Sequence, residues 1–431
     1  MPCFFLGRYY VGSGGKMAQL QHSGLLKFRC LKRRIGLGLI PASAVEIRIY
    51  QSEEPETIVK TVITDENGIT EEIELAAPDR QLSLTRDNII KPYSEYAAVV
   101  ENQNGYRDVD ISGIEIFDGV LAIQTIILEE NEEPGVNYVI PDHTLYGNYP
   151  SKIPEEEIKP VNTQGEIVLS RVVVPEYIIV HDGAPTDPTA QNYYVKYIDY
   201  IKNVACSEIY STWPEETIRA NVLAIMSFTL NRVYTEWYRS KGYEFTITSS
   251  TAFDHKWINK RDIFQPIARI VEDCFNQYLS RPNVKQPILT QYCDGRMVSC
   301  PNWMTQWGSK ALGEQGYSAI EILRRYYGQT IYINTAEQIS GIPSSYPGYE
   351  LSVGNSGEKV RILQEQLTTI HDAYPRIPKL TADGIYGSKT RDAVKIFQEV
   401  FDLPVTGNVD FRTWYKISQI YTGVTRIGEL Y

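Results

Sequence analysis

The sequence predicts a multidomain α+β protein: an N-terminal β-sandwich, a central mixed α+β domain and a small C-terminal domain of three helices. Three observations predict this. The chain has 431 residues, and domains of about 100–200 residues would divide it into two to four units. Short runs rich in Val, Ile and Tyr fill residues 24–128. Apolar residues at helical spacing are concentrated in the second half of the chain.

The composition excludes several classes of protein. Hydrophobic residues make up 43% and charged residues 22% of the chain, as in ordinary folded proteins. The net charge of −11 argues against a nucleic-acid binder. No apolar run approaches the roughly 20 residues that span a bilayer, so no membrane span is expected. The 31 tyrosines suit sugar-stacking surfaces and half-buried sheets equally well, and the composition leaves that choice open.

The N-terminal part is expected to form a β-sandwich over residues 24–128, after a leader at residues 1–23. Turn signals such as TDENG and NGY separate short runs of strand-forming residues, and regular spacing of this kind is typical of a sandwich. The apolar run IGLGLIPASAV imitates a secretory signal, but it is short, contains Pro41 and starts too far into the chain. The expected strands are Gly24–Arg29, Ala44–Tyr50, Ile58–Ile63, Thr70–Leu75, Tyr96–Glu101 and Ala122–Leu128.

Residues 129–160 are predicted to be a solvated linker, because they are rich in charge and proline and offer little to bury. An exposed segment of this kind is where a protease would cut. The central domain follows at residues 161–345, and residues 350–431 form the C-terminal domain. In the central domain we expect strands at Glu166–Val174 and Tyr177–His181, and helices at Gln191–Asn203, after TWPEE with Thr212 as N-cap, at Ile263–Tyr278 and at Ala319–Tyr327.

The six cysteines and five histidines give no metal-binding pattern. The cysteines are scattered and form no CxxC pair, so neither a metal nor a cofactor is expected. Cys293 and Cys300 are seven residues apart and are compatible either with a disulfide or with two free buried thiols. Free thiols are the preferred interpretation.

The C-terminal segment resembles the peptidoglycan-binding domain of cell-wall hydrolases. About 70 residues carry the likeness, beginning with VRILQEQL and AVKIFQ as amphipathic helix faces and DGIYG and TG as turns. The resemblance implies a three-helix fold that binds the bacterial wall. Tyr386 and Trp414 are the candidates for contact with glycan or stem peptide, although aromatic residues of such a domain also build its core.

The central domain resembles the stage II sporulation protein D family of glycan-cleaving enzymes. Three stretches, about 150 residues in all, carry the match: CSEIYSTWP with the helix after it, TSSTAFDHKWINKRD, and QYCDGRMVSCPNWMTQWG with EILRRYYG. Some members of that family bind zinc through Cys and His, and that pattern is not reproduced here. The resemblance places the catalytic carboxyl at Glu208.

Glu208 suits the role of an acid that protonates a glycosidic oxygen. Ile209, Tyr210 and Trp213 follow it and would keep water away from its carboxyl, and a helix is expected to start just after it. Hydrolysis usually needs a second carboxylate, whereas a lytic transglycosylase uses the muramic 6-hydroxyl as its nucleophile and needs one carboxyl only. The single well-placed candidate therefore favours transglycosylation.

Six residues in the matched stretches are candidates for contacting the substrate. Two lie in AFDHKW and the others near the CDG and MTQWG motifs, which are expected to line the cleft. The tryptophans suit stacking on sugar faces, and core packing is the equally good alternative. These candidates are Asp254, His255, Asp294, Gln306, Trp303 and Trp307.

The order of the parts resembles the spore cortex-lytic enzymes of endospore formers, which are made in a pre-pro form. In that arrangement residues 24–128 form a prealbumin-like pro-domain, and a germination protease removes it by cutting the linker. The resemblance implies a lytic transglycosylase that cleaves cortex glycan strands between muramic acid and glucosamine during germination. It also implies synthesis in the mother cell and a place in the cortex or coat region of the spore. The alternatives are a non-catalytic wall-binding protein or an enhancer of another wall hydrolase, and an amidase or peptidase.

Overall fold

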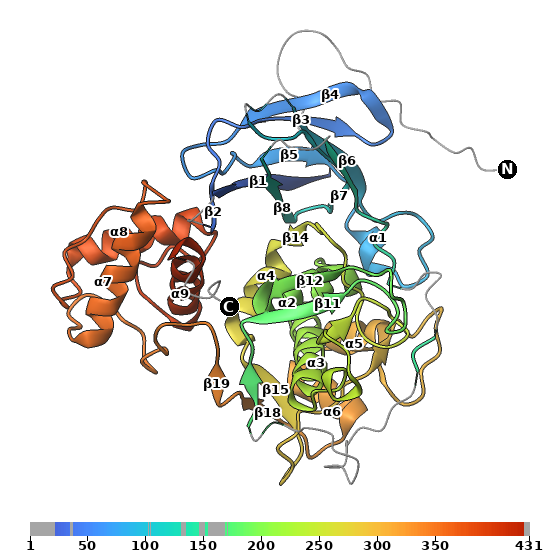
Figure 1. Ribbon diagram of the computed structural model, residues 1–431. Coiled ribbons are helices and arrows are strands. Elements are labelled where there is room, and N and C mark those ends of the chain that lie inside the picture. The colour runs from blue at the N-terminus through green and yellow to red at the C-terminus, as the bar shows by residue number, and fades with distance from the viewer. Residues whose placement is uncertain are drawn as a thin grey trace.

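The computed structural model describes residues 22–34, 38–101, 103, 105–130, 135–145, 151–153, 169 and 171–425. The protein is mixed α+β, and its N-terminal sheets, central helices and C-terminal helices form three parts that contact one another (Figure 1). Most of the expected leader at residues 1–23 lies outside the described residues, as do residues 166–168 and 170 of the strand expected at Glu166–Val174. Of that expected strand, the structure shows β10 at Val173–Val174.

Two five-stranded sheets form the N-terminal part, and the central part contributes one strand to the first of them, β14 (Ile263–Phe264). The first sheet has the order β14-β8-β1-β2, with β5 also paired to β1, and the second has the order β4-β3-β6-β7-β9. Strands β1 and β8 are parallel, whereas β3 pairs antiparallel with both β4 and β6. The strands are β1 (Ser23–Arg34), β2 (Gly38–Pro41), β3 (Glu46–Gln51), β4 (Glu54–Ile63), β5 (Ile73–Ala76), β6 (Ser94–Val100), β7 (Val109–Ile116), β8 (Leu121–Leu128) and β9 (Val136–Val139).

Alternating side chains explain why these strands stack as two layers. In β6 every second residue is buried, and in β8 the same alternation covers most of the strand. The buried sets of both sheets belong to one apolar core, to which β1 contributes Leu26 and Phe28 and β7 contributes Ile111 and Ile114. All six expected strands are found, and β2, β7 and β9 are additions. The relation to prealbumin-like domains stays a prediction.

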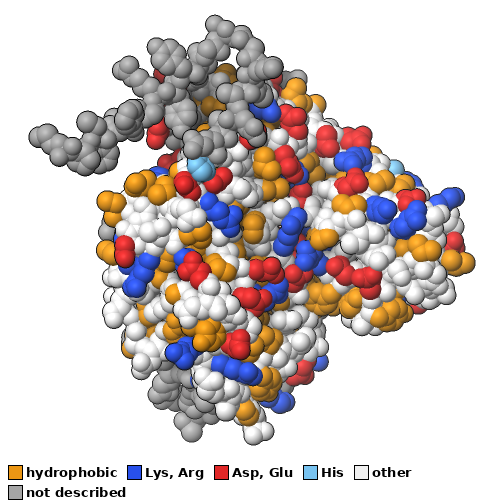
Figure 2. Space-filling view, turned by 180° about the vertical axis from the view of Figure 1, so that it is seen from behind, with side chains coloured by type: hydrophobic (Ala, Val, Ile, Leu, Met, Phe, Trp, Pro, Cys, Tyr) orange, Lys and Arg blue, Asp and Glu red, His pale blue; other side chains and the backbone are white. Residues whose placement is uncertain are grey.

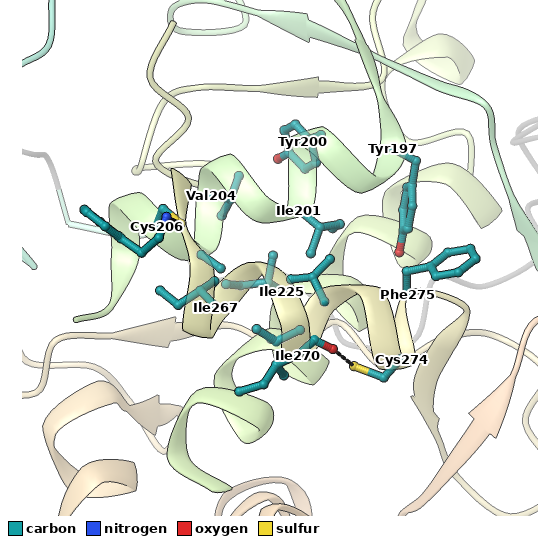
Figure 3. Packing of buried hydrophobic residues seen from close by; sticks show 14 of the residues in the cluster. Tyr197, Tyr200, Ile201, Val204, Cys206, Ile225, Ile267, Ile270, Cys274 and Phe275 are labelled. Carbon is teal, nitrogen blue, oxygen red and sulfur yellow. Dashed lines mark hydrogen bonds between the residues drawn. The ribbon is translucent and has the colours of Figure 1, made fainter. Parts of the chain in front are cut away.

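Three helices form the centre of the second part: α2 (Tyr197–Glu208), α3 (Glu215–Tyr234) and α4 (Gln265–Cys274). Helix α3 is buried on all sides along most of its length rather than on one face only, and its buried residues include polar ones such as Asn221 and Arg232. Figure 3 shows Ile201 and Val204 of α2 close to Ile225 of α3 and to Ile267 and Ile270 of α4. These contacts fix the end of α2, where Glu208 lies.

Several element boundaries differ from those expected. The helix predicted at Gln191–Asn203 is a strand, β12 (Asn192–Lys196), followed by α2, because residues 192–196 pair with β11 (Tyr177–His181). Glu208 is therefore the last residue of α2, and the helix expected after it is α3, which begins at Glu215. The helix predicted at Ile263–Tyr278 is divided into β14 (Ile263–Phe264), α4 and β15 (Gln277–Ser280).

The next helix also starts later than expected. Pro214 is the N-cap of α3, and the expected cap, Thr212, is instead hydrogen-bonded to Ser83 of the N-terminal part. The remaining central elements are β10 (Val173–Val174), β13 (Ile247–Thr248), β16 (Tyr292–Cys293), β17 (Met304–Thr305), α5 (Gln306–Glu314), α6 (Ala319–Tyr327), β18 (Tyr332–Thr335) and β19 (Gln338–Ile339), with a 3₁₀ turn at Arg239–Lys241.

The C-terminal part consists of α7 (Glu358–His371), α8 (Ser388–Val400) and α9 (Phe411–Thr425). Two buried glutamines tie its helices to its turns. The side-chain oxygen of Gln364 accepts from the backbone N–H of Gly384 at 2.8 Å, and that of Gln398 accepts from Gly407 at the same distance. Both glycines have positive φ, near 72°, which favours Gly at these turns.

The N-terminal and central parts share a sheet and a buried ion pair. Strand β14 of the central part pairs with β8 at the edge of the first sheet. Glu115 of β7 binds the guanidinium of Arg261, and His143 Nδ1 lies 3.0 Å from the same carboxylate. All three side chains are fully buried. Removing either partner would leave an uncompensated buried charge, which is strongly destabilising.

Parts of the described section of the linker pack against the domains, contrary to the fully solvated segment that we predicted, while other residues such as Val139 are exposed. Residues Val136–Val139 form β9 parallel to β7, and His143 is 2% exposed within the interface. The prediction considered only composition, and it missed that a few apolar and aromatic residues of the linker fill a gap between two domains. The rest of the linker lies outside the described residues.

The C-terminal part contacts both of the others (Figure 1). Asp402 forms a 2.6 Å ion pair with Lys27 of β1, and Arg412 donates to Asp273 at 2.8 Å. Glu272 is buried between Lys202 and Lys416. Burial would raise the pKa of Glu272, but Lys202 and then Lys416 lower it to about 2.

The exposed surface mixes charges of both signs. Figure 2 shows acidic and basic side chains interspersed across one face of the molecule. Within the described residues, no helix combines the length and the apolar character needed to cross a membrane.

Candidate active site around Glu208

The carboxylate of Glu208 is held from two sides at the C-terminus of α2. The backbone N–H of Lys256 donates to Oε1 at 2.8 Å, and the side-chain amide of Gln306 donates to Oε2 at 3.0 Å. Glu208 is 6% exposed and Gln306 is 1% exposed. The two hydrogen bonds fix the orientation of the carboxyl group, which is what a general acid at a glycosidic oxygen requires. The structure therefore brings together Glu208 and one of the predicted substrate-contact candidates, Gln306.

Tyr292 packs beside this carboxylate. Its ring is fully buried, and burial, followed by the negative charge of Glu208, raises the pKa of its hydroxyl well above the usual value. The same rise in pKa includes a side-chain interaction with Glu208, so the hydroxyl of Tyr292 lies within reach of that carboxylate.

A disulfide shapes the loop beside Glu208, contrary to the free thiols that we preferred. Cys293 and Cys300 are bonded, and Asp294 lies inside the loop that they close. The Asp294 carboxylate accepts from the backbone N–H groups of Met297, at 2.7 Å, and Val298, at 2.9 Å. Asp294 thus holds the loop in place and also lines the cavity beside Glu208. The sequence could not decide this pairing, because seven-residue spacing permits both states.

Asp254 is part of a buried network behind the site. Its carboxylate accepts from Arg232 Nε at 2.7 Å, from the hydroxyl of Tyr238 at 2.6 Å and from the backbone and side chain of Thr248. Asp254 is 0% exposed. With its lone pairs occupied, it positions the loop that carries Lys256 rather than facing a substrate.

His255 is also buried behind the site. Its Nδ1 lies 3.1 Å from the hydroxyl of Tyr200, and its ring lies between Phe228 and Tyr292, with centroids 4.4 Å and 5.8 Å away. Burial, and then the positive charges of Lys152 and Arg232, lower the pKa of His255 well below its usual value. The imidazole is therefore neutral and packs as an aromatic ring. Among the described residues, its Nε2 finds no hydrogen-bond partner.

The aromatic residues near Glu208 form a wall that the N-terminal part covers. Trp213 and Trp307 lie 5.0 Å apart between ring centroids, and Tyr210 packs on Trp213. The indole N–H of Trp213 donates to the backbone carbonyl of Ser83 at 3.1 Å. Trp307 is 6% exposed, whereas Trp303 is only partly buried in the loop before β17. Neither Trp213 nor Trp307 offers an open ring face in this state.

The cavity at Glu208 is small and is closed partly by the linker. It measures about 50 Å³ and is lined on the central side by Glu208, Lys256, Tyr292 and Gln306. Leu145 and Lys152 of the linker complete its wall. A cavity of this size has room for water rather than for a sugar ring.

Lys152 and its neighbour bind the linker to the site. The Lys152 ammonium donates to the backbone carbonyl of Asp254 and lies 5.1 Å from the ring centre of Tyr292. The backbone N–H of Ile153 donates to Ala252 at 2.8 Å. Sequence reasoning missed Lys152, Lys256 and Tyr292. Tyr292 and Lys256 lie within matched motifs, next to residues that we did select, whereas no sequence signal links Lys152 to Glu208.

The two wall-binding candidates of the C-terminal part are buried. Tyr386 and Trp414 are each 1% exposed. The hydroxyl of Tyr386 donates to the carbonyl of Gly407 at 2.9 Å, and the indole N–H of Trp414 donates to Ser344 at 3.0 Å. Both side chains build the core in this structure, and neither presents its ring to a polymer.

One group among the described residues has the composition of a metal site. His22, Asp79 and Asp118 place three ligand atoms within 4.8 Å of one another. The group lies in the N-terminal part, away from the cavity-lining residues of the Glu208 site. His22 Nδ1 and Asp118 already pair with each other at 3.1 Å.

Comparison with known proteins identifies the C-terminal part. Residues 356–417 match the family described as "Putative peptidoglycan binding domain". This match supports peptidoglycan as a partner and makes the chain a cell-wall-related protein. No curated protein matches the chain.

Three solved structures share limited likeness. The SleB N-terminal domain matches with 30% identity over 18% of this chain and 99% of its own, with a TM-score of 0.16. GBS52, the minor pilin of Streptococcus agalactiae, matches with 16% identity over 27% of this chain and 48% of its own, with a TM-score of 0.19. The Bacillus anthracis TIE protein matches with 20% identity over 25% of this chain and 18% of its own, with a TM-score of 0.18. TM-scores this low define no shared overall fold.

Proposed function

We propose that the protein is a lytic transglycosylase of peptidoglycan, made as an inactive precursor, with Glu208 as its acid and base. The observation that carries the proposal is the Glu208 carboxylate itself. It is buried, oriented by Lys256 and Gln306, and lines a cavity in a chain that also contains a peptidoglycan-binding domain. A carboxyl so placed can protonate the glycosidic oxygen and then accept the proton of the muramic 6-hydroxyl.

The set of groups around Glu208 favours transglycosylation over hydrolysis. The cavity is lined by two carboxyl residues, Glu208 and Asp294. Asp294 is engaged by three backbone N–H groups, those of Arg296, Met297 and Val298. A second carboxylate tied down in this way is poorly placed to activate a water molecule, as an inverting hydrolase requires, or to attack the anomeric carbon, as a retaining hydrolase requires. The substrate's own hydroxyl then serves as nucleophile.

The covered cavity supports the precursor state. Leu145 and Lys152 of the linker close it, and the N-terminal helix α1 (Gln81–Leu84) lies against Trp213. A glycan strand must reach Glu208, so the linker has to leave before it can bind. Cleavage between Glu129 and Pro160 by a germination protease would permit this, and the spore cortex is the substrate that we assign.

The experiment compares the intact chain with a chain cut in the linker on purified cortex fragments. A recognition site for a specific protease replaces residues 146–150, and release of soluble muropeptides is followed. We expect release only after the cut, and none from the cut Glu208→Gln variant. A cut chain that binds fragments and never releases them would instead make the protein a non-catalytic wall binder.

A further inference from the structure

We propose that Lys256 binds an acyl oxygen of the substrate, and that the linker occupies this position in the uncleaved chain. The proposal rests on the function assigned to the Glu208 site and adds one substrate contact to it. The backbone and the side chain of Lys256 have different roles. The backbone N–H orients Glu208, and the ammonium faces the linker.

The linker presents amide carbonyls to this ammonium. Lys256 Nζ donates to the carbonyl oxygen of Thr144 at 3.0 Å and lies 3.4 Å from the carbonyl oxygen of Asp142. The hydroxyl of Thr144 is also 3.4 Å from Nζ. A muramyl residue offers the same groups, because its N-acetyl and lactyl substituents carry amide carbonyls next to sugar hydroxyls.

Burial explains why this ammonium takes acceptors from the linker. Lys256 is 3% exposed, and an ammonium buried without acceptors is strongly unfavourable. Burial, and then the charge of Arg261, lower its pKa to about 8, against the opposing effect of Glu208. When the linker withdraws, the ammonium loses the carbonyls of Thr144 and Asp142. A substrate carbonyl restores those bonds at a point adjacent to the acid.

A purely structural role for Lys256 would be to anchor the linker. The two roles predict different results once the linker is cut, because an anchor no longer matters then. Lys310 provides a matched control. It is 6% exposed and donates to the carbonyl of Leu84 in the N-terminal part at 2.5 Å, but it does not line the Glu208 cavity.

The test measures binding by calorimetry to the full chain cut in the linker, with both fragments present. One probe is a glucosaminyl-muramyl disaccharide with its stem peptide, which contains no bond for the enzyme to cleave. The other is a chitin disaccharide, which has N-acetyl groups and no lactyl group. Binding needs no chemistry, so this test remains valid if glycan cleavage itself is never observed.

We expect Lys256→Met to weaken binding of the muramyl probe at least tenfold, because a hydrogen bond to a charged group is lost. Lys256→Arg should retain most of the affinity, and Lys310→Met all of it. If Lys256→Met loses affinity for the muramyl probe only, the lactyl carbonyl is the acceptor of the Lys256 ammonium. If it loses affinity equally for both probes, the acceptor is an N-acetyl carbonyl. Unchanged affinity in a folded Lys256→Met chain, judged by its thermal unfolding, would overturn the proposal, as would failure of the cut wild-type chain to bind either probe.

Discussion

Trp213 of the central part donates its indole N–H to the backbone carbonyl of Ser83, 130 residues earlier in the chain, at 3.1 Å. This bond joins the aromatic wall beside Glu208 to helix α1 of the N-terminal part. Nearby, the hydroxyls of Ser83 and Thr212 are 2.7 Å apart, and Arg80 donates to the carbonyl of Thr212. The N-terminal part thus rests on the aromatic wall beside Glu208.

Replacing Lys152 with Ala should raise the activity of the uncleaved chain. The ammonium donates to the carbonyl of Asp254 and lies over the rings of Phe228 and Tyr292, so its removal weakens the hold of the linker on the site. A lost hydrogen bond from a charged group corresponds to an increase of about tenfold or more in the open population. Muropeptide release by the intact chain measures this.

Lys60→Ala is the control for that change. Lys60 lies on the outer strand β4 and pairs with Glu71 at 2.8 Å. Its loss should leave activity at the level of the intact wild-type chain. If Lys152→Ala and Lys60→Ala both release no more muropeptide than the intact wild-type chain, Lys152 does not help to keep the site closed.

Glu208→Gln should reduce glycan cleavage by about 10²–10⁴-fold, the usual contribution of general acid catalysis. Glutamine retains the size of the side chain and can accept the N–H of Lys256, but it has no proton to transfer. Glu215→Gln is the matched control, because Glu215 lies in the first turn of α3 with 69% of its side chain exposed. Binding to insoluble peptidoglycan should be unchanged in both. Near-wild-type cleavage by Glu208→Gln would remove Glu208 from the acid role.

Asp262→Asn should change how stability depends on pH. Asp262 is fully buried, and burial raises the pKa of its carboxyl to about 7 against the lowering effect of Arg261. Because the folded-state pKa lies above the unfolded value of about 3.9, the stabilising contribution is complete below about pH 4 and is lost as pH rises towards 7. Asparagine does not titrate, so the variant should gain stability relative to wild type between pH 5 and pH 8.

Thermal unfolding of the two chains at these pH values tests that prediction. Asp87→Asn serves as control, since 87% of the Asp87 side chain is exposed. A difference between Asp262→Asn and wild type that is the same at pH 5 and pH 8 would show that Asp262 does not titrate in this range.

Gln398→Leu should destabilise the C-terminal part by about 1–3 kcal/mol. Its amide accepts from the backbone N–H of Gly407 and donates to the carbonyl of Asn408 at 2.8 Å, so leucine would leave both groups buried without a partner. Gln366→Leu is a matched control in the same domain. Gln366 is 3% exposed, and neither end of its amide has a partner within the described chain. If urea unfolding shows that Gln398→Leu and Gln366→Leu lower the free energy of unfolding equally, the hydrogen bonds of Gln398 to the turn do not stabilise the domain.

Local sequence patterns predicted the exact first and last residues of some elements. Helix α6 begins and ends where the sequence indicates, because Ser318 and Glu321 form a capping box and Gly328 follows the last turn. Residues 192–196 were misassigned because their tyrosines suit a helix as well as a strand. Their strand conformation depends on pairing with β11, a tertiary contact that no local window contains.

In the candidate site, too, local motifs predicted some features, whereas features that depend on tertiary packing were not predicted. The catalytic role of Glu208 stays a prediction. The proximity of Gln306 to Glu208 was predicted from motifs, although the two residues are separated by 98 positions. The roles of Asp254 and His255 were not, because burial decides whether a polar side chain faces a ligand or a neighbour. The linker's place over the cavity depends on the packing of His143 and Lys152 between domains, which composition alone does not indicate.

The sugar ends released by the cut chain test the central claim most directly. Cortex glycan is digested in ¹⁸O-labelled water, and the products are analysed by mass spectrometry. Transglycosylation at Glu208 predicts 1,6-anhydro-muramic ends that carry no label, since the 6-hydroxyl of the substrate attacks the anomeric carbon. Reducing ends that carry one atom of ¹⁸O from the water would show hydrolysis and contradict the mechanism proposed for this protein.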